Sequence, residues 1–310
     1  MSSSEPALAD ARFQPSRGRD RFESSLGRDR FELARCKRCG SAVTLGLLPS
    51  GLYDTGAYRP DPPRLHRLAR PALALFDRQR LSLARSLARP PARLLDAGAG
   101  RGRFVAAAAA AGYDAVGIEP SARGVEAAAA IGAAVRCMSI EDGEFEPSSV
   151  DVVTLWHVLE HLERPGGALE RIHSWLRPRG GLVVGVPNLA SLQARVGGGR
   201  WYHLDVPRHR THFTPRGLHE LLRSRGFAIV GTHHVLLEHN PFGMWQSLVN
   251  SATRHPSYLY NLLKRNAPVG STDLLITAAA LPLAPVAALT ELAAGLAGRG
   301  GTIAVRARRA

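Results

Sequence analysis

The sequence predicts an α/β fold with a mostly parallel sheet, and three observations support this class. Short apolar runs that suit buried strands alternate with segments of helical period over residues 92–225. Three glycines at alternate positions, Gly98, Gly100 and Gly102, lie between the first of these strands and a helix. The next strand ends on an acid, Glu119. Strands that alternate with helices form a parallel sheet that is covered on both faces.

Length and composition indicate a globular protein with one large core and appendages. The chain has 310 residues, 45% hydrophobic and 21% charged, with a formal net charge of +14. Arginines gather between Arg59 and Arg103, where they would suit phosphates, an acidic glycan or an anionic membrane. The aromatic residues of a single-strand nucleic-acid platform do not interleave with them, so no nucleic-acid partner is expected.

The first 60 residues are expected to stand apart from the α/β fold. Residues 1–32 are polar and contain a tandem repeat, so a disordered N-terminal tail is expected. No apolar signal peptide is evident, which favours a cytoplasmic location. Cys36 and Cys39 have the spacing of half a zinc knuckle, but a structural zinc ion needs four ligands. Bound zinc is therefore not expected.

The elements can be placed in chain order. Leucines at helical spacing predict a helix over 64–88, with Pro71 at its start or at a kink. The predicted strands lie near residues 92–97, 114–119, 133–137, 150–156 and 181–186. The predicted helices lie near residues 102–111, 121–131, 165–177 and 214–225, the last with Thr214 as its cap and Pro215 in its first turn. Two further strand-like runs cover residues 227–234 and 302–308.

The spacing of the glycines indicates the class of ligand. A dinucleotide-binding fold has its third glycine where this chain has Arg103. An acid such as Glu119 at the end of the second strand suits the two hydroxyls of a ribose. Asp96, the glycines and Glu119 resemble motif I and the second-strand acid of the class I S-adenosylmethionine (SAM) dependent methyltransferases. The resemblance implies a Rossmann-like, seven-stranded sheet with an antiparallel last strand, helices on both faces, and SAM as cofactor.

The resemblance also implies roles for single residues. Asp96 would organise the loop and face the amino group of SAM, and Glu119 would bind the ribose. An acidic or backbone contact to the adenine is expected after the third strand, although a solvated loop is equally compatible with the two adjacent acids there. The expected cofactor-binding residues are Asp96, Gly98, Gly100, Gly102, Glu119, Ile140, Glu141, Trp156 and His157.

Two further blocks resemble the methyltransferase-11 and methyltransferase-23 groups, namely residues 151–165 and 200–215. The second would form a substrate-facing loop, or alternatively a hydrogen-bonded strut. A hydroxyl acceptor needs a base with a pKa near neutral, which favours histidine. The candidate catalytic residues are His157, His161, His209 and His212. His157 and His161 also resemble a metal pair, but no third ligand is evident and no metal is expected.

The resemblance divides the chain into segments. Residues 33–60 would be a degenerate zinc-ribbon-like segment, and 61–237 with 300–310 the methyltransferase domain. Residues 238–299 would be a helical insertion near the active site. Within it, 274–289 is apolar but interrupted by prolines. A buried hairpin over the active site is expected there, and the alternative is peripheral membrane contact through 274–298, at the inner face of the membrane.

The function that these observations favour is transfer of a methyl group from SAM to a small-molecule, lipid-linked or glycan-type acceptor, with O-methylation preferred. One alternative is a catalytically silent SAM-fold partner module. A less favoured one is a nicotinamide-dependent oxidoreductase, against which Arg103 argues. A homodimer that shares a four-cysteine zinc site is a further alternative. The sequence does not identify the acceptor.

Overall fold

The core of the protein is a seven-stranded sheet. The structure, a computed structural model, describes residues 15–23, 30–46, 66–264 and 271–310. The strands lie in the order β10-β11-β8-β7-β4-β5-β6. All adjacent pairs are parallel except the two that involve β11, which runs antiparallel to both neighbours. The strands are β4 (Arg93–Ala97), β5 (Asp114–Glu119), β6 (Val135–Cys137), β7 (Val150–Trp156), β8 (Leu176–Pro187), β10 (Phe227–His233) and β11 (Thr302–Arg309). The predicted fold class is confirmed.

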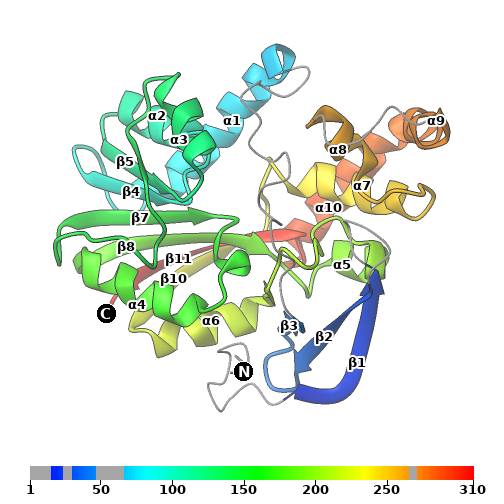
Figure 1. The fold of residues 1–310 in the computed structure, drawn as a ribbon, viewed down its shortest axis with the longest axis horizontal. Coiled ribbons are helices and arrows are strands. Elements are labelled where there is room, and N and C mark those ends of the chain that lie inside the picture. Colours follow the sequence, from blue (N-terminus) through cyan, green and yellow to red (C-terminus); the bar gives the residue numbers. More distant parts are fainter. Residues whose placement is uncertain (1–14, 24–29, 47–65, 265–270) are drawn as a thin grey trace.

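Helices cover both faces of this sheet (Figure 1). One layer contains α1 (His66–Arg85), α2 (Arg103–Ala110) and α3 (Ala122–Ala129). The other contains α4 (Pro165–Trp175) and α6 (Pro215–Ser224). Successive strand residues point to opposite faces, so Leu94 and Val152 pack in the first layer while Leu95 and Val153 pack in the second. Pro71 lies inside α1 and not at its start, so the second of the two positions expected for it is the one observed.

The start of α6 shows how local sequence fixes an element. Thr214 accepts a hydrogen bond from the backbone N–H of Gly217 through its hydroxyl, and Pro215 occupies the first helical position. This is the predicted cap. The same hydroxyl donates to the Cys39 carbonyl at 2.6 Å, so the cap also ties α6 to the N-terminal segment.

A second, smaller sheet lies beside the first and has the order β1-β2-β3-β9. Its strands are β1 (Pro15–Glu23), β2 (Arg30–Cys36), β3 (Ala42–Thr44) and β9 (Thr211–His212). The expectation of a disordered tail is therefore wrong for residues 15–23 and 30–32. The two copies of the repeat pair antiparallel, and their register sets Arg21 opposite Glu32. The rest of the expected tail, 1–14 and 24–29, lies outside the described residues.

The chain between β10 and β11 is mainly helical. It contains α7 (Asn240–Asn250), α8 (Tyr258–Leu263), α9 (Ser271–Ala280), the 3-10 turn η3 (Leu281–Leu283) and α10 (Ala284–Leu296). These helices lie beyond the carboxyl ends of β7 and β8 (Figure 1). Met244, Trp245 and Val249 of α7 pack against Ala287 of α10. The expected boundary between residues 60 and 61 lies outside the described residues.

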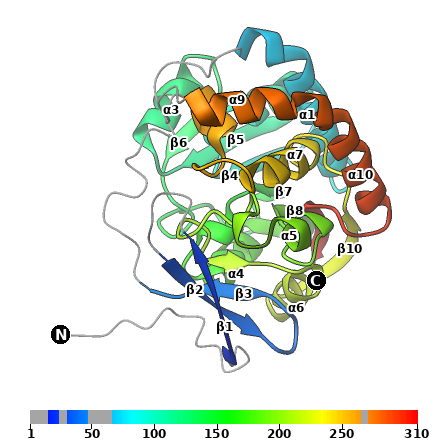
Figure 2. The same ribbon diagram turned by 90° about the vertical axis from the view of Figure 1, so that its right-hand side faces the viewer.

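Helices α9 and α10 lie at the surface (Figure 2), and several of their leucines are exposed. Residues 272–296 are long and apolar enough to cross a membrane, and 17% of the most apolar window is buried. Leu275, Leu289 and Leu296 are 69%, 67% and 78% exposed. The expected buried hairpin is therefore wrong, because α7 covers only one side of these helices.

Candidate functional site

The glycine loop follows β4 and leads into α2. Gly98 and Gly102 have φ angles of 80° and 74°, in the left-handed region that favours glycine. A Cβ on Gly98 would lie 2.3 Å from a methyl group of Val158, and one on Gly102 would lie 2.7 Å from the Cβ of Ala128. The loop is thus packed tightly against Val158 after β7 and against Ala128 of α3.

Two buried acids flank this loop. Asp96 of β4 accepts a hydrogen bond from the Thr154 hydroxyl at 2.6 Å, and burial raises the pKa of its carboxyl to about 6. Glu119, at the end of β5, accepts from the backbone N–H groups of Gly100 and Ser121 at 2.9 and 3.0 Å. Burial also raises its pKa. Carboxylates kept from water at adjacent strand ends suit a ligand that carries cationic groups and hydroxyls, as SAM does.

The residues after β6 lie in two different environments. Ile140 is 4% exposed and packs in the core, whereas Glu141 is exposed to solvent. The neighbouring Asp142 accepts a hydrogen bond from the Ser139 hydroxyl at 2.7 Å. The contact of this segment with adenine stays a prediction.

A cluster of ion pairs joins α1, the glycine loop and the chain before α7. Arg80 lies over the Trp156 ring, with its guanidinium carbon 4.8 Å from the ring centroid. It pairs with Glu238 at 2.6 Å. Arg103 pairs with the same Glu238 at 2.7 Å and with Asp77 at 3.5 Å. Sequence reasoning did not single out Arg80, because nothing local separates it from the other arginines of α1.

Three histidines meet at the exit of β7: His203 is buried, and His157 and His239 are partly buried. The ring centroid of His157 lies 4.1 Å from that of His239 and 6.0 Å from that of His203. Within the described part of the chain, the Nε2 atoms of all three are buried without a hydrogen-bond partner. Burial lowers the pKa of His157 to about 4 and that of His203 to about 3. These rings are therefore neutral at pH 7 and can accept a proton or a hydrogen bond.

His157 also contacts a carboxylate. It has a φ of 56° and directly precedes the 3-10 turn η1 (Leu159–His161). Its Nδ1 lies 3.2 Å from Glu160 Oε1. Burial raises the pKa of Glu160 to about 7. Sequence reasoning did not single out Glu160, although it lies between the two histidines of the block.

The ring of His161 contacts that of His209. The sequence instead sets His161 beside His157, through their spacing of four residues. The ring centroids of His161 and His209 are 4.6 Å apart, and both residues converge with Glu160. His212 is positioned differently, because its Nε2 lies 2.9 Å from the Thr44 hydroxyl. That hydroxyl donates to the His209 carbonyl at 2.6 Å, so the ring N–H of His212 must donate to it. His212 therefore ties the loop to β3 through Nε2. Its role as a base stays a prediction.

The cysteines are placed as follows. Cys36 and Cys39 lie in the tight turn between β2 and β3 and are 6% and 8% exposed. No third metal ligand joins them among the residues that the structure describes. Cys137 is exposed at the end of the edge strand β6. The absence of zinc stays a prediction.

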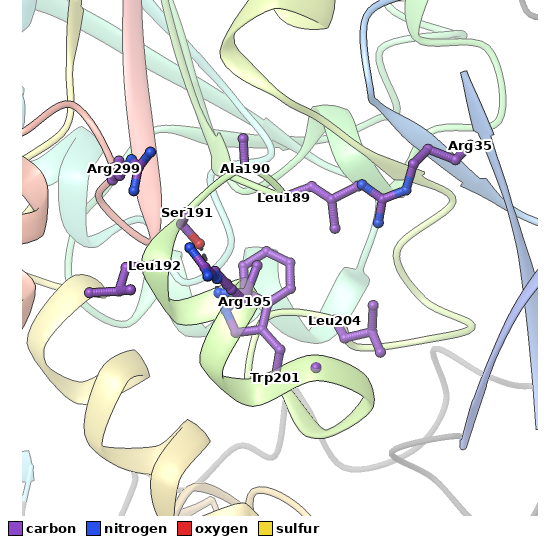
Figure 3. Close-up of a pocket in the computed structure, with 11 residues that line it drawn as sticks. Arg35, Leu189, Ala190, Ser191, Leu192, Arg195, Trp201, Leu204 and Arg299 are labelled. Carbon is purple, nitrogen blue, oxygen red and sulfur yellow. Dashed lines mark hydrogen bonds between the residues drawn. The ribbon is translucent and has the colours of Figure 1, made fainter. Parts of the chain in front are cut away.

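A cavity of about 340 Å³ lies beside the loop after β8, apart from the glycine loop (Figure 3). Three of the residues that line it are arginines, and none of the described residues that line it is acidic. Trp201 and Leu204 supply an apolar wall. The arginines are Arg35 from β2, Arg195 from α5 (Leu192–Gly197) and Arg299.

Comparisons with known proteins agree with this geometry. The sequence model of a methyltransferase domain family matches residues 65–232, which is more than half of the chain. No curated protein matches the chain. The structure resembles the (4+2)-cyclase SpnF, at 21% identity and a TM-score of 0.51 over 75% of this chain and 80% of the cyclase. It also resembles a sarcosine dimethylglycine methyltransferase from Galdieria sulphuraria, at 16% identity and a TM-score of 0.51 over 79% and 88% of the two chains.

The structural similarities establish the fold alone, since a cyclase shares it. The family match covers α1, the glycine loop, both buried acids and the histidines that follow β7. This chain belongs to the methyltransferase domain family and is a class I SAM-dependent methyltransferase.

Proposed function

We propose that this protein transfers the methyl group of SAM to a hydroxyl oxygen of a small-molecule or lipid-linked acceptor, with His157 as general base. The observation that carries this proposal is the contact of His157, whose Nε2 is buried, with the buried Glu160 at the carboxyl end of β7. The Nδ1 atom of His157 faces the carboxylate, so Nε2 carries the lone pair in the neutral ring. In the described part of the protein that Nε2 has no partner.

The cofactor would be held by the elements around the glycine loop. Asp96 would bind its cationic amino group and Glu119 its ribose, while Gly98 and Gly102 allow close approach of the backbone. When bound, SAM supplies an electrophilic methyl group on its sulfonium sulfur. The protein therefore has mainly to align the acceptor and exclude water.

The chain's own groups would then manage the acceptor proton. His157 would take the hydroxyl proton at Nε2, and Glu160 would stabilise the imidazolium that forms. His239 packs against the His157 ring, and the Nε2 atom of His157 is buried. A base whose charged form is disfavoured by burial binds the proton only while the acceptor oxygen is reacting.

The test compares hydroxyl and amine acceptors by the release of S-adenosylhomocysteine. In His157→Asn we expect turnover of hydroxyl acceptors to fall by about 10²–10⁴-fold, with an unchanged Kd for SAM. The matched control is His173→Asn, because His173 lies on α4 and packs on Phe227 in the opposite layer. An amine acceptor that His157→Asn methylates at the wild-type rate would refute O-methylation. Cofactor binding without turnover of any acceptor would favour the silent partner module.

We further propose that the acceptor carries an anionic group and is met at the inner face of the membrane. Two features support this: the exposed apolar face of α9 and α10, and the cavity lined by three arginines. Arginine binds phosphate and carboxylate in a planar, bidentate manner. A helix with one apolar face exposed to solvent is typical of contact with a lipid interface.

A further inference from the structure

We propose that Glu160, His161 and His209 form a binding site for a divalent transition-metal ion, of the class that includes Zn²⁺ and Co²⁺. One ligand atom from each residue lies within 4.8 Å of the other two. Glu160 and His209 are 1% and 6% exposed. Two imidazole nitrogens and a carboxylate form a donor set that suits these ions and leaves coordination positions open.

The tautomers of the two histidines favour this site. His161 Nδ1 lies 3.1 Å from the carbonyl oxygen of Arg208, and His209 Nδ1 lies 2.9 Å from that of His203. A carbonyl oxygen can only accept, so Nδ1 carries the proton in both rings and Nε2 carries the lone pair. Metal-ligating histidines are oriented in this way by backbone carbonyls.

Glu160 adds a third electron-pair donor. Its Oε1 faces His157 Nδ1 at 3.2 Å, and its Oε2 is buried without a hydrogen-bond partner in the described chain. The cluster thus offers two imidazole nitrogens and a buried carboxylate oxygen within reach of one another. A buried carboxylate oxygen without a partner is costly, and a cation bound between the three residues would pair it.

The two loops that supply the ligands are fixed to each other before any ion binds. Glu160 and His161 belong to η1, which directly follows β7, and His209 belongs to the loop before β9. The backbone N–H of Arg210 donates to the Glu160 carbonyl at 2.7 Å. This bond joins the loops next to all three ligands, so little ordering remains for the ion to induce.

The test is titration of the full-length, chelator-treated protein with Co²⁺, followed by the visible absorption of the bound ion. We expect one Co²⁺ per chain without thiolate charge-transfer bands. In His209→Asn and His161→Asn the Kd for Co²⁺ should rise by at least about tenfold, because loss of even the outer groups of such sites costs 10–100-fold. His219→Asn is the control, since His219 lies on α6 and its Nε2 bonds the Thr232 hydroxyl of β10. Circular dichroism confirms that each variant is folded.

Two outcomes would overturn the proposal. Thiolate bands that disappear in a Cys36→Ser, Cys39→Ser variant would assign the ion to the cysteines. Failure of the folded wild-type protein to bind Co²⁺ or Zn²⁺ stoichiometrically would mean that a proton, shared with Glu160, occupies the cluster. Neither outcome touches methyl transfer, because the measured quantity is metal binding and His157 is unchanged in every variant.

Discussion

Burial sets the charge of the side chains around the glycine loop. It raises the pKa of Asp96 and Glu119 and lowers those of His157 and His203, because the charged form of each group is poorly solvated there. The acids thus titrate closer to neutral pH than usual, and the imidazoles stay uncharged. A cationic ligand that enters this region would favour the ionised acids.

We predict that SAM binds more tightly as the pH rises from 5 to 7. The pKa of Asp96 is raised from 3.8 to about 6, so below that pH the carboxyl is mostly protonated and must lose its proton to bind the cation. Below the pKa, affinity should fall by up to about tenfold per pH unit, the limit for one linked proton. Calorimetric titration across this range is the measurement. Asp96→Asn should bind more weakly, with the pH dependence removed; an unchanged dependence would contradict the assignment.

We predict that Glu119→Ala weakens SAM binding by about 1.5–3 kcal/mol, as expected for loss of hydrogen bonds to a charged group. The carboxylate lies at the end of β5 and also anchors the Gly100 backbone, so both the ribose contact and the loop would be affected. Isothermal calorimetry measures the change. Glu170→Ala is the control, because that side chain is exposed on α4 in the opposite layer. Equal affinities of Glu119→Ala and the wild type would remove the ribose assignment.

At the scale of elements, the small N-terminal sheet braces the histidine loop. β3 pairs with β9, and Ser41 and Thr44 bond the loop on either side of that strand. The loop carries His203, His209 and His212, so a segment more than 150 residues away in the chain positions part of the site. His212 supports the alternative of a hydrogen-bonded strut. The substrate-facing role of the loop stays a prediction, and His203 lies beside His157.

We predict that Thr44→Val lowers the free energy of unfolding by about 1–3 kcal/mol, because it leaves the buried His209 carbonyl and the His212 ring without their partner. Denaturant unfolding monitored by circular dichroism is the measurement. The control is Ser174→Ala, in which an exposed hydroxyl loses only a local bond to the Arg171 carbonyl. A loss no larger than that of the control would show that the N-terminal sheet does not brace the loop.

At the scale of the whole molecule, the protein has two chemically distinct surfaces beyond the carboxyl end of β8. Arginines line the cavity after β8, and the helices α9 and α10 present exposed leucines. An apolar face of this kind must be covered by lipid, by a second copy or by another partner in the cell, since exposed apolar area costs about 25 cal/mol per Å². A second copy of the chain and a membrane are thus competing occupants of this surface.

We predict that the protein co-sediments with vesicles that contain anionic lipid, and that Leu289→Glu with Leu296→Glu abolishes this binding. Both leucines are more than two-thirds exposed on α10, so their replacement should leave the fold intact while the charges oppose insertion. The matched control is Ile131→Glu, an apolar residue after α3 that is also more than half exposed. Light scattering that shows a wild-type dimer, converted to a monomer by the double variant and without vesicle binding, would assign the face to a second copy instead.

The sequence by itself determined what depends on neighbours along the chain. Alternating apolar runs predicted the parallel sheet, the glycines predicted the left-handed turn after β4, and Thr214 with Pro215 predicted the start of α6. Each of these signals works through interactions within a few residues: strand and helix periodicity, backbone torsions and caps. These signals can therefore be interpreted from the sequence without knowledge of the fold.

Only the tertiary structure decided what meets across the chain. Glu160 faces His209, Arg80 covers Trp156, the repeat copies pair as a hairpin, and α9 and α10 stay largely uncovered. The sequence shows whether such a residue is charged, polar or apolar, but not which residue it contacts. That contact depends on how the strands, loops and helices pack against one another. Metal-ligand geometry, pKa shifts and exposed apolar faces all arise from that closure, since each depends on which groups exclude water from which others.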